Sequence, residues 1–320
     1  ISVTDFYTSI FKEMNEPVES LDTIDAMTNY FSIGVNSKSQ AWIADSDRDA
    51  IILVSRFGEH LDTITLPRDI EPDLFESIIT SPRLPGERET LIDSDHAYGI
   101  SSVGIDSRDN VWVSLADLPQ LLRFDDLPED ATSRETDPSK DDGPIRVQIE
   151  IPDCDPLRLH PQKLETDRDD NIWVSVLYGN RETTDWSEPL ADEWTHRFYL
   201  LKYSKKEQST GVKEEYEQTA LIKFDTGVHL HDILVDGYND IWVTNCAPTR
   251  DLDGYNPSIG GLYHISKDGE ILNTITDYID PDTNITEKFD KPSQLIMDMR
   301  DNLWICHRGN ELLRVHTDLD

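Results

Sequence analysis

The stretch Asp-Ser-Arg-Asp-Asn-Val-Trp-Val-Ser, residues 106–114, decides the fold because the chain repeats it. Five such segments align on a tryptophan, at Trp42, Trp112, Trp173, Trp242 and Trp304, with spacings of 70, 61, 69 and 62 residues. Six residues before each tryptophan stands Asn36, Asp106, Asp167, Asp236 or Asp298, and two before it stands Gln40, Asn110, Asn171, Asp240 or Asn302. Self-similarity at a nearly constant period indicates a repeat architecture.

Each copy is typical of a β-hairpin. A short apolar run, such as residues 101–105, precedes a polar turn, and a second apolar run begins with the tryptophan. Asp and Asn suit such a turn because their side chains bond to neighbouring backbone N–H groups. We therefore expect the aspartates to hold the turns and each tryptophan to pack between adjacent repeats.

Two further strands are expected in most copies. The third strand is predicted to end at Phe57, Phe124, Tyr203, Ile265 and Val315. A fourth apolar segment follows at residues 62–67, 144–151, 219–224 and 270–275. Four strands in 60 to 70 residues favour a propeller over the shorter solenoid repeats. The sequence thus predicts an all-β, five-bladed β-propeller with four antiparallel strands per blade.

The repeats fill the chain, so a single domain over residues 1–320 is predicted. Blades are expected at about 27–95, 96–155, 156–226, 227–287 and 288–320. The last copy lacks its fourth strand. We expect residues 2–11 to supply it and close the ring, which would remove an exposed sheet edge, with the rest of 1–26 as connector. Long insertions are expected at 125–144, 180–197 and 247–260.

The charge is extreme, with 64 acidic and 29 basic residues and a net charge of −35. Nucleic acid is not expected as a partner, because its binding needs clustered Lys and Arg, and no apolar run is long enough for membrane insertion. The acidity favours adaptation to high salt, where ions screen the repulsion, although an ordinarily acidic surface or a cationic partner stays open. Cys154, Cys246 and Cys306 are expected to be thiols outside any disulfide framework or zinc site.

The signature Asp-x-x-Asp/Asn-Asn-apolar-Trp-Val/Ile resembles the repeats of the NHL and streptogramin-lyase-like β-propellers. It also looks like the repeats of sensor-kinase periplasmic propellers and of the gluconolactonase group. The resemblance covers about nine residues in each of five repeats and implies the fold. It spans enzymes, ligand binders and interaction modules, among them modules of large surface or virion proteins such as tail fibres, so function has to be argued from the site.

Ligand sites of propellers lie where the innermost strands begin. The position ten residues before each tryptophan gives the expected channel-lining residues Ser32, Ser102, Lys163, Asp232 and Gln294. One residue earlier stand Phe31, Ser101, Gln162, His231 and Ser293. Side chains alternate along a strand, so only one of these two registers can face the channel, and the sequence leaves both open.

The sharpest constellation is His229, His231 and Asp232, with His160 in the neighbouring blade. Imidazoles could bind a transition metal, or act as a general base that Asp232 orients, and they could equally bond to backbone carbonyls at a polar channel mouth. The resemblance to streptogramin lyases implies catalytic His and Glu residues on channel-facing loops. The nearest glutamate, Glu165, lies deeper in its strand, so that pattern is not matched.

The many aspartates make calcium the cofactor to consider, because carboxylate oxygens bind it. Asp45, Asp47 and Asp49 begin like an EF-hand loop but lack its glycine and its final glutamate, and Asp251 and Asp253 form a similar fragment. Such fragments are more often solvated turns than cation sites. No cofactor is expected, with calcium or another cation as the alternative.

We expect a non-enzymatic recognition propeller that belongs to a larger extracellular or virion assembly and binds proteins or surface glycans. The insertions are the expected binding surfaces, because loops on a rigid scaffold often carry recognition. Their candidate contacts are Trp186, Trp194, Arg250 and Tyr255, since aromatic residues and Arg commonly anchor interfaces. The alternative is a lyase- or lactonase-like enzyme that uses His229, His231, Asp232 and His160.

Overall fold

The computed structural model describes residues 32–45, 49–66, 99–116, 118–125, 144–179, 197–206, 214–225, 228–246, 260–279, 284–289, 292–298, 302–307 and 311–315. Within these ranges the regular structure is β-strand apart from one short 3-10 helix, Pro156–Arg158. In this part of the chain no helix has the length and apolar character that crossing a membrane requires.

Four sheets each contain four antiparallel strands that pair in chain order. The first comprises β1 (Ile33–Val35), β2 (Ala41–Asp45), β3 (Ala50–Val54) and β4 (His60–Thr65). The second comprises β5 (Ile100–Ile105), β6 (Val111–Leu115), β7 (Gln120–Phe124) and β8 (Ile145–Gln148). The third comprises β9 (Leu159–Thr166), β10 (Ile172–Tyr178), β11 (Arg197–Lys205) and β12 (Tyr216–Lys223). The fourth comprises β13 (Leu230–Val235), β14 (Ile241–Asn245), β15 (Gly261–Ile265) and β16 (Ile271–Ile275).

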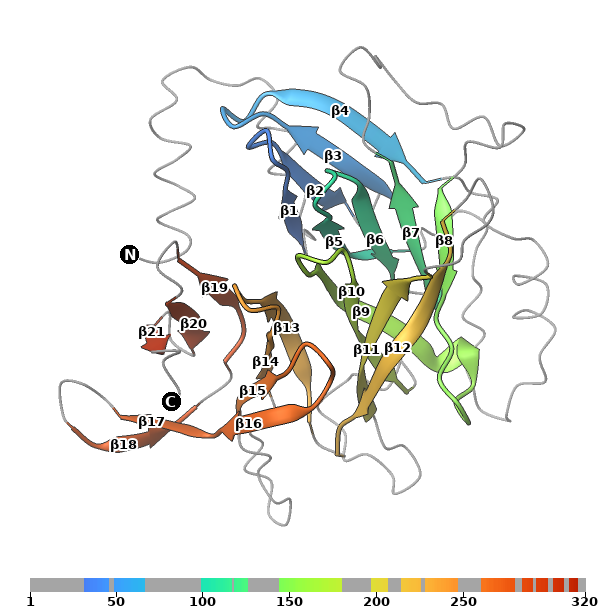
Figure 1. Ribbon diagram of the computed structural model, residues 1–320. Helices are drawn as coiled ribbons and strands as arrows, with labels where there is room; N and C mark the ends of the chain where they lie inside the picture. The colour runs from blue at the N-terminus through green and yellow to red at the C-terminus, as the bar shows by residue number, and fades with distance from the viewer. Residues whose placement is uncertain are drawn as a thin grey trace, which may run out of the picture.

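The fifth sheet has three strands within the described residues, β19 (Leu295–Met297), β20 (Leu303–His307) and β21 (Glu311–Val315). A small hairpin of β17 (Asp277–Ile279) and β18 (Thr286–Lys288) links it to the fourth sheet. The first strands of successive sheets are neighbours, from β1 through β5, β9 and β13 to β19, and Figure 1 shows the sheets following one another around a common centre. The chain is an all-β, five-bladed β-propeller, as predicted. The segment expected to close the ring lies outside the described residues.

In blades two to five the first turn is held by the predicted aspartate, and in the first blade it is held by Asn36, whose Oδ1 accepts the backbone N–H groups of Lys38 and Gln40. Asp167 Oδ1 accepts the backbone N–H groups of Asp169 and Asn171 at 3.0 and 2.9 Å, and its Oδ2 accepts Nε1–H of Trp173 at 3.4 Å. Asp106, Asp236 and Asp298 also accept the indole N–H six residues on. The left-handed φ that this turn needs falls three residues before the tryptophan, at Ser39, Asp109, Asp170 and Asn239. Asn and Asp tolerate that conformation better than most residues.

Successive turns are also bonded to each other. Ser107 donates its backbone N–H and its hydroxyl to the two carboxylate oxygens of Asp170, at 2.8 and 2.9 Å. Ser37 of the first blade makes the same pair of bonds to Asp109 of the second blade. The repeat therefore encodes contacts between blades as well as the turn within each blade.

The tryptophans pack between blades, as predicted. Trp112 is fully buried and belongs to a core with Leu164 and Val174 of the third blade. Trp173 packs in the same way with residues of the fourth blade, and Trp242 with residues of the fifth. Each core is shared by two neighbouring sheets, so the ring is stabilised blade by blade.

The predicted end of one third strand was wrong. β3 ends at Val54, which pairs with Ala41, whereas Phe57 lies in the turn that follows and is 55% exposed. Val54 is therefore the counterpart of Phe124, which pairs with Val111 in the second blade. The motif Ser-Arg-Phe imitates Leu-Leu-Arg-Phe locally, but strand pairing places it three residues too far along the chain.

Candidate functional site

Polar side chains at the starts of the inner strands join one blade to the next. Ser32 Oγ accepts the backbone N–H of Val103 at 3.1 Å and lies 3.0 Å from Ser102 Oγ. Ser102 in turn accepts the backbone N–H of Leu164 at 3.1 Å and is completely buried. Two of the expected channel residues therefore bond neighbouring inner strands. A channel-lining role for this register stays a prediction.

Lys163 and Asp232 hold the same position in the third and fourth blades, where the link is ionic. Lys163 Nζ lies 3.7 Å from Asp232 Oδ1, and Asp232 Oδ2 accepts the backbone N–H of Leu295 in the fifth blade at 2.9 Å. One carboxylate thus connects three blades. The backbone carbonyl of Gln294, the last residue of this register, accepts the N–H of Cys306 at 2.9 Å.

Glu165 lies two residues beyond Lys163 on β9 and has the most unusual acidity near the centre. Burial, with a smaller contribution from the charge of Asp232, raises the pKa of Glu165 to about 7, although Lys163 and the Thr166 backbone act in the opposite direction. Protein surrounds the carboxyl, yet its side chain keeps some accessible surface. Such a group can hold a proton near neutral pH.

Two further groups, Asp232 and Cys306, are perturbed in the same direction. Burial raises the pKa of Asp232, against the influence of Lys163 and the Leu295 N–H. Burial and the nearby Asp232 raise the pKa of the Cys306 thiol. The centre therefore gathers Lys163, Glu165, Asp232 and Cys306 from three blades, which we call the central cluster. Sequence reasoning set Glu165 aside because it lies deeper in its strand, whereas that depth is what changes its acidity.

We expect Glu165→Gln to change how stability depends on pH. A carboxyl whose pKa is raised on folding makes the native state bind more protons than the unfolded chain, so wild-type stability falls as pH rises from about 4.5 to about 7. Glutamine stays neutral and escapes that loss. The variant should therefore gain about 3 kcal/mol relative to wild type between about pH 4 and pH 8, measured by urea unfolding. A difference that does not vary with pH would contradict the assignment.

The three candidate histidines are engaged separately. His160 is buried, with Nδ1–H donating to the carbonyl of Ala116 at 3.1 Å. Nδ1–H of the exposed His231 donates to the carbonyl of Ser293 at 2.9 Å. The His229 ring stacks on Phe198 with 4.9 Å between ring centres. A role for these imidazoles in catalysis or metal binding stays a prediction.

Most of the other candidates belong to segments outside the described residues. These are Trp186, Trp194, Arg250, Tyr255, Asp47, Asp251 and Asp253. Asp45 ends β2 and pairs with Ala50 at the start of β3, and Asp49 Oδ1 accepts the backbone N–H of Gly99 at 3.0 Å. These two aspartates therefore belong to a β-hairpin. Cys154, Cys246 and Cys306 are partly buried thiols.

A second polar feature, which sequence reasoning missed, lies over the tryptophans. The third-strand residue that pairs with each tryptophan carries a cationic or imidazole side chain in four blades, namely Arg123, Lys202, His264 and Arg314. Lys202 Nζ lies 5.2 Å from the centre of the Trp173 ring and 3.8 Å from Asp167 Oδ2. In the first blade the pairing residue is the uncharged Leu53, and the turn residue is the uncharged Asn36. The signal was present in the motifs at 121–124, 200–203, 262–265 and 312–315.

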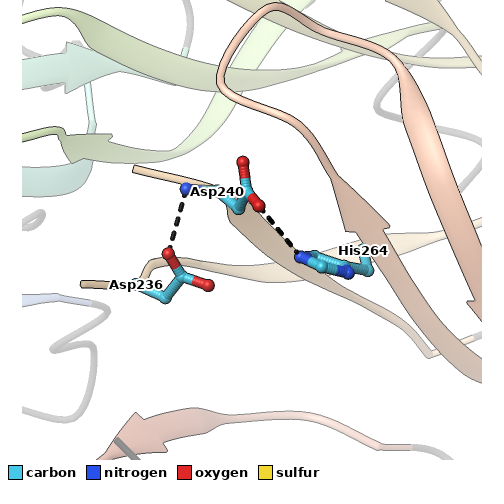
Figure 2. Close-up of side chains that lie close together, drawn as sticks. All are labelled: Asp236, Asp240 and His264. Carbon is cyan, nitrogen blue, oxygen red and sulfur yellow. Dashed lines mark hydrogen bonds and ion pairs between the residues drawn. The ribbon is translucent and has the colours of Figure 1, made fainter. Parts of the chain in front are cut away.

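In the fourth blade this position forms a cluster of metal-binding residue types, shown in Figure 2. Asp236, Asp240 and His264 each offer one ligand atom, and the three atoms lie within 4.8 Å of one another. Nε2 of His264 is 3.4 Å from Asp240 Oδ2, and the imidazole lies flat on the Trp242 ring at 4.1 Å. Among the described residues, these three are the one set of His, Cys, Asp or Glu side chains that lie close enough together to share an ion.

Blade topology and the repeated Asp–Trp turn define the chain as a five-bladed β-propeller, and its likeness to streptogramin-lyase-like propellers is one of fold. Virginiamycin B lyase from Staphylococcus aureus is 14% identical with a TM-score of 0.46, and the match covers 91% of this chain and 67% of the lyase. Regucalcin from Agrobacterium tumefaciens, a calcium-binding protein, is 10% identical with a TM-score of 0.47, covering 92% and 72%.

A gluconolactonase from Xanthomonas campestris is 11% identical with a TM-score of 0.34, covering 88% of this chain and 84% of that protein. No family model matches the chain, and no curated protein does. At these identities and TM-scores the solved structures carry no argument about activity, so function has to be argued from the residues of this chain.

Proposed function

We propose that the chain is a non-enzymatic recognition propeller, a rigid ring that presents binding loops. The observation that carries this proposal is that polar side chains expected to line the channel instead bond neighbouring blades to one another. Ser102 accepts a backbone N–H of the third blade, and Asp232 accepts one of the fifth blade while pairing with Lys163. Groups committed to holding neighbouring blades together are poorly placed to change partners during a reaction.

The proposed partners are other proteins or surface glycans in a larger extracellular or virion assembly. The binding surfaces are the insertions at 125–144, 180–197 and 247–260, and Trp186, Trp194, Arg250 and Tyr255 are the proposed contacts. Large aromatic side chains and Arg supply much of the binding energy at protein interfaces, and aromatic rings also stack on sugars. The net charge of −35 is proposed to be an adaptation to high salt.

The salt proposal predicts that molar KCl stabilises the isolated chain. Carboxylates on a surface of this charge repel one another, and raising the ionic strength from about 0.1 to about 1 M shortens the screening length from about 10 to about 3 Å. We expect the free energy of unfolding to rise by about 2 kcal/mol or more over that range, measured by urea unfolding. Equal stability at both salt concentrations would mean that the acidic surface is no adaptation to salt.

The recognition proposal is tested by binding to glycan and protein arrays, with variants in two places. Trp186→Ala and Trp194→Ala should abolish a specific signal that wild type gives, because they remove the proposed anchors. Lys163→Met changes only the central cluster and should retain the signal. Loss of binding in Lys163→Met alone, or no specific binding by wild type, would count against recognition by the loops.

A second candidate function is supported by the central cluster. Glu165 with a pKa near 7 beside Asp232 and Lys163 suits proton transfer to a small ligand at the centre of the ring. Glu165→Gln would then abolish turnover of a lactone or lyase substrate without affecting binding by the loops. The two functions are therefore separated by comparing Glu165→Gln with Trp186→Ala in the same assays.

A further inference from the structure

We propose that Asp236, Asp240 and His264 bind one divalent transition metal ion, of which Zn²⁺ is the best fit, between the first turn and the third strand of the fourth blade. The ligands would be Nε2 of His264 and one carboxylate oxygen from each aspartate (Figure 2). An imidazole with carboxylates suits zinc and its neighbours, whereas Ca²⁺ and Mg²⁺ prefer oxygen ligands alone.

The fourth blade departs from its siblings at two positions that touch each other. Two residues before the tryptophan, blades two, three and five carry an asparagine whose amide donates to the turn aspartate, as Asn171 does to Asp167 at 2.8 and 2.9 Å. Asp240 stands there in the fourth blade and has no such donor. On the third strand, His264 replaces the Arg or Lys of those blades. Each change exchanges a hydrogen-bond donor for a side chain that can bind a metal.

These exchanges leave two carboxylates close together, where blades two, three and five pair one carboxylate with an amide. Asp236 Oδ1 accepts the N–H groups of Tyr238 and Asp240, and its Oδ2 accepts the indole N–H of Trp242. Two close carboxylates repel each other, and a nearby positive charge offsets that repulsion. In the other blades Arg or Lys supplies that charge, and here a bound cation would supply it.

The imidazole is the independent sign that points to a ligand. Its Nε2 atom is buried and makes no hydrogen bond within the described residues, while the ring is held on Trp242 with an interplanar angle of 6°. Nε2 lies 3.4 Å from Asp240 Oδ2. Two ligand atoms at about 2.0 to 2.2 Å from a tetrahedral zinc ion are about 3.4 Å apart, so the spacing of this pair of atoms suits a zinc ion.

Surrounding contacts fix both aspartates in place. The backbone N–H of Lys267 donates to Asp240 Oδ1 at 3.0 Å, which leaves Oδ2 directed at His264. Asp236 is fixed by the turn bonds described above. Hydrogen bonds of this kind orient the ligands of metal sites and raise metal affinity. The metal would join β15 to the turn that precedes β14, and so brace the fourth blade.

The competing interpretation is that His264 simply replaces the Arg or Lys of the other blades as a protonated side chain. A matched variant separates the two. Asp240→Asn with His264→Lys rebuilds the set that the third blade uses, Asn171 and Lys202, which keeps the positive charge and removes two metal ligands. This variant should fold, because the chain already contains that arrangement.

The test is calorimetric titration of the chelator-treated full chain with ZnCl₂ in molar KCl, which suppresses diffuse binding to the acidic surface. Wild type should bind one ion, and its melting temperature should rise with Zn²⁺ but not with Mg²⁺. The double variant should bind at least about 100-fold more weakly and lose the thermal response. Equal Zn²⁺ binding by wild type and the double variant, or no binding by either, would overturn the proposal.

A gain of function provides a second readout that does not depend on how the double variant folds. Asn171→Asp with Lys202→His transplants the fourth-blade set into the third blade beside Asp167. The stoichiometry should rise from one to two Zn²⁺ per chain, with Co²⁺ giving twice the visible absorption of wild type. An unchanged stoichiometry in the folded variant would show that these side chains do not make a metal site.

Discussion

Trp173→Ala is expected to lower the free energy of unfolding by about 4 kcal/mol, the largest effect of any single substitution considered. The indole is fully buried in the core shared by the third and fourth blades, and its N–H donates to Asp167. Removing it opens a cavity between two rigid sheets that cannot collapse into the space. It also leaves the Lys202 ammonium without the ring that it lies over.

Urea unfolding followed by circular dichroism would measure the loss. Tyr238→Ala is the control, because Tyr238 is also a large aromatic residue but lies in the turn before β14 and is 79% exposed. Its cost should stay below about 0.5 kcal/mol. If both variants lost the same small amount, the tryptophans would not be the structural links between blades that we infer.

Asp167→Ala should destabilise the chain by about 3 kcal/mol, since it removes the buried acceptor of several donors at once. The carboxylate accepts the N–H groups of Asp169 and Asn171, the Asn171 amide and the Trp173 indole, and it lies 3.8 Å from Lys202 Nζ. The exposed Asp268, replaced by Ala as a control, should cost less than about 0.5 kcal/mol by the same urea measurement.

The first blade suggests how the loss can be reduced. It uses Asn36 in the turn and Leu53 opposite the tryptophan, a neutral pair in place of the ionic one. Asp167→Asn alone leaves Lys202 without its counter-charge, so adding Lys202→Leu should recover part of the stability. If the second substitution instead deepened the loss, the charge on the third strand and the turn carboxylate would not be coupled.

The fold could be predicted because its information is local. The turn residue Asp106, the left-handed Asp109 and Trp112 lie within seven residues, and the same spacing recurs five times. The mistaken strand end at Phe57 shows the limit of that information, because strand register depends on partners elsewhere in the chain. Val54 is the true counterpart of Phe124 only because it pairs with Ala41.

The candidate sites were harder to predict because they depend on what three strands bring together. The sequence singled out Asp232 and Lys163 but could not show that they pair across two blades. It passed over Glu165, whose acidity comes from the protein that surrounds it. It also missed Asp240 and His264, which become neighbours through the pairing of β14 with β15 and whose meaning depends on comparison with the other blades.

The most direct test of the central claim is a density map of the native assembly that carries this chain, at a resolution that traces side chains. The recognition account predicts that segments 180–197 and 247–260 contact the partner, with Trp186, Trp194 or Tyr255 buried there, and that Lys163 pairs directly with Asp232. Density for a bound small molecule that bridges Glu165, Asp232 or His231, with those segments facing solvent, would contradict it and favour chemistry at the centre of the ring.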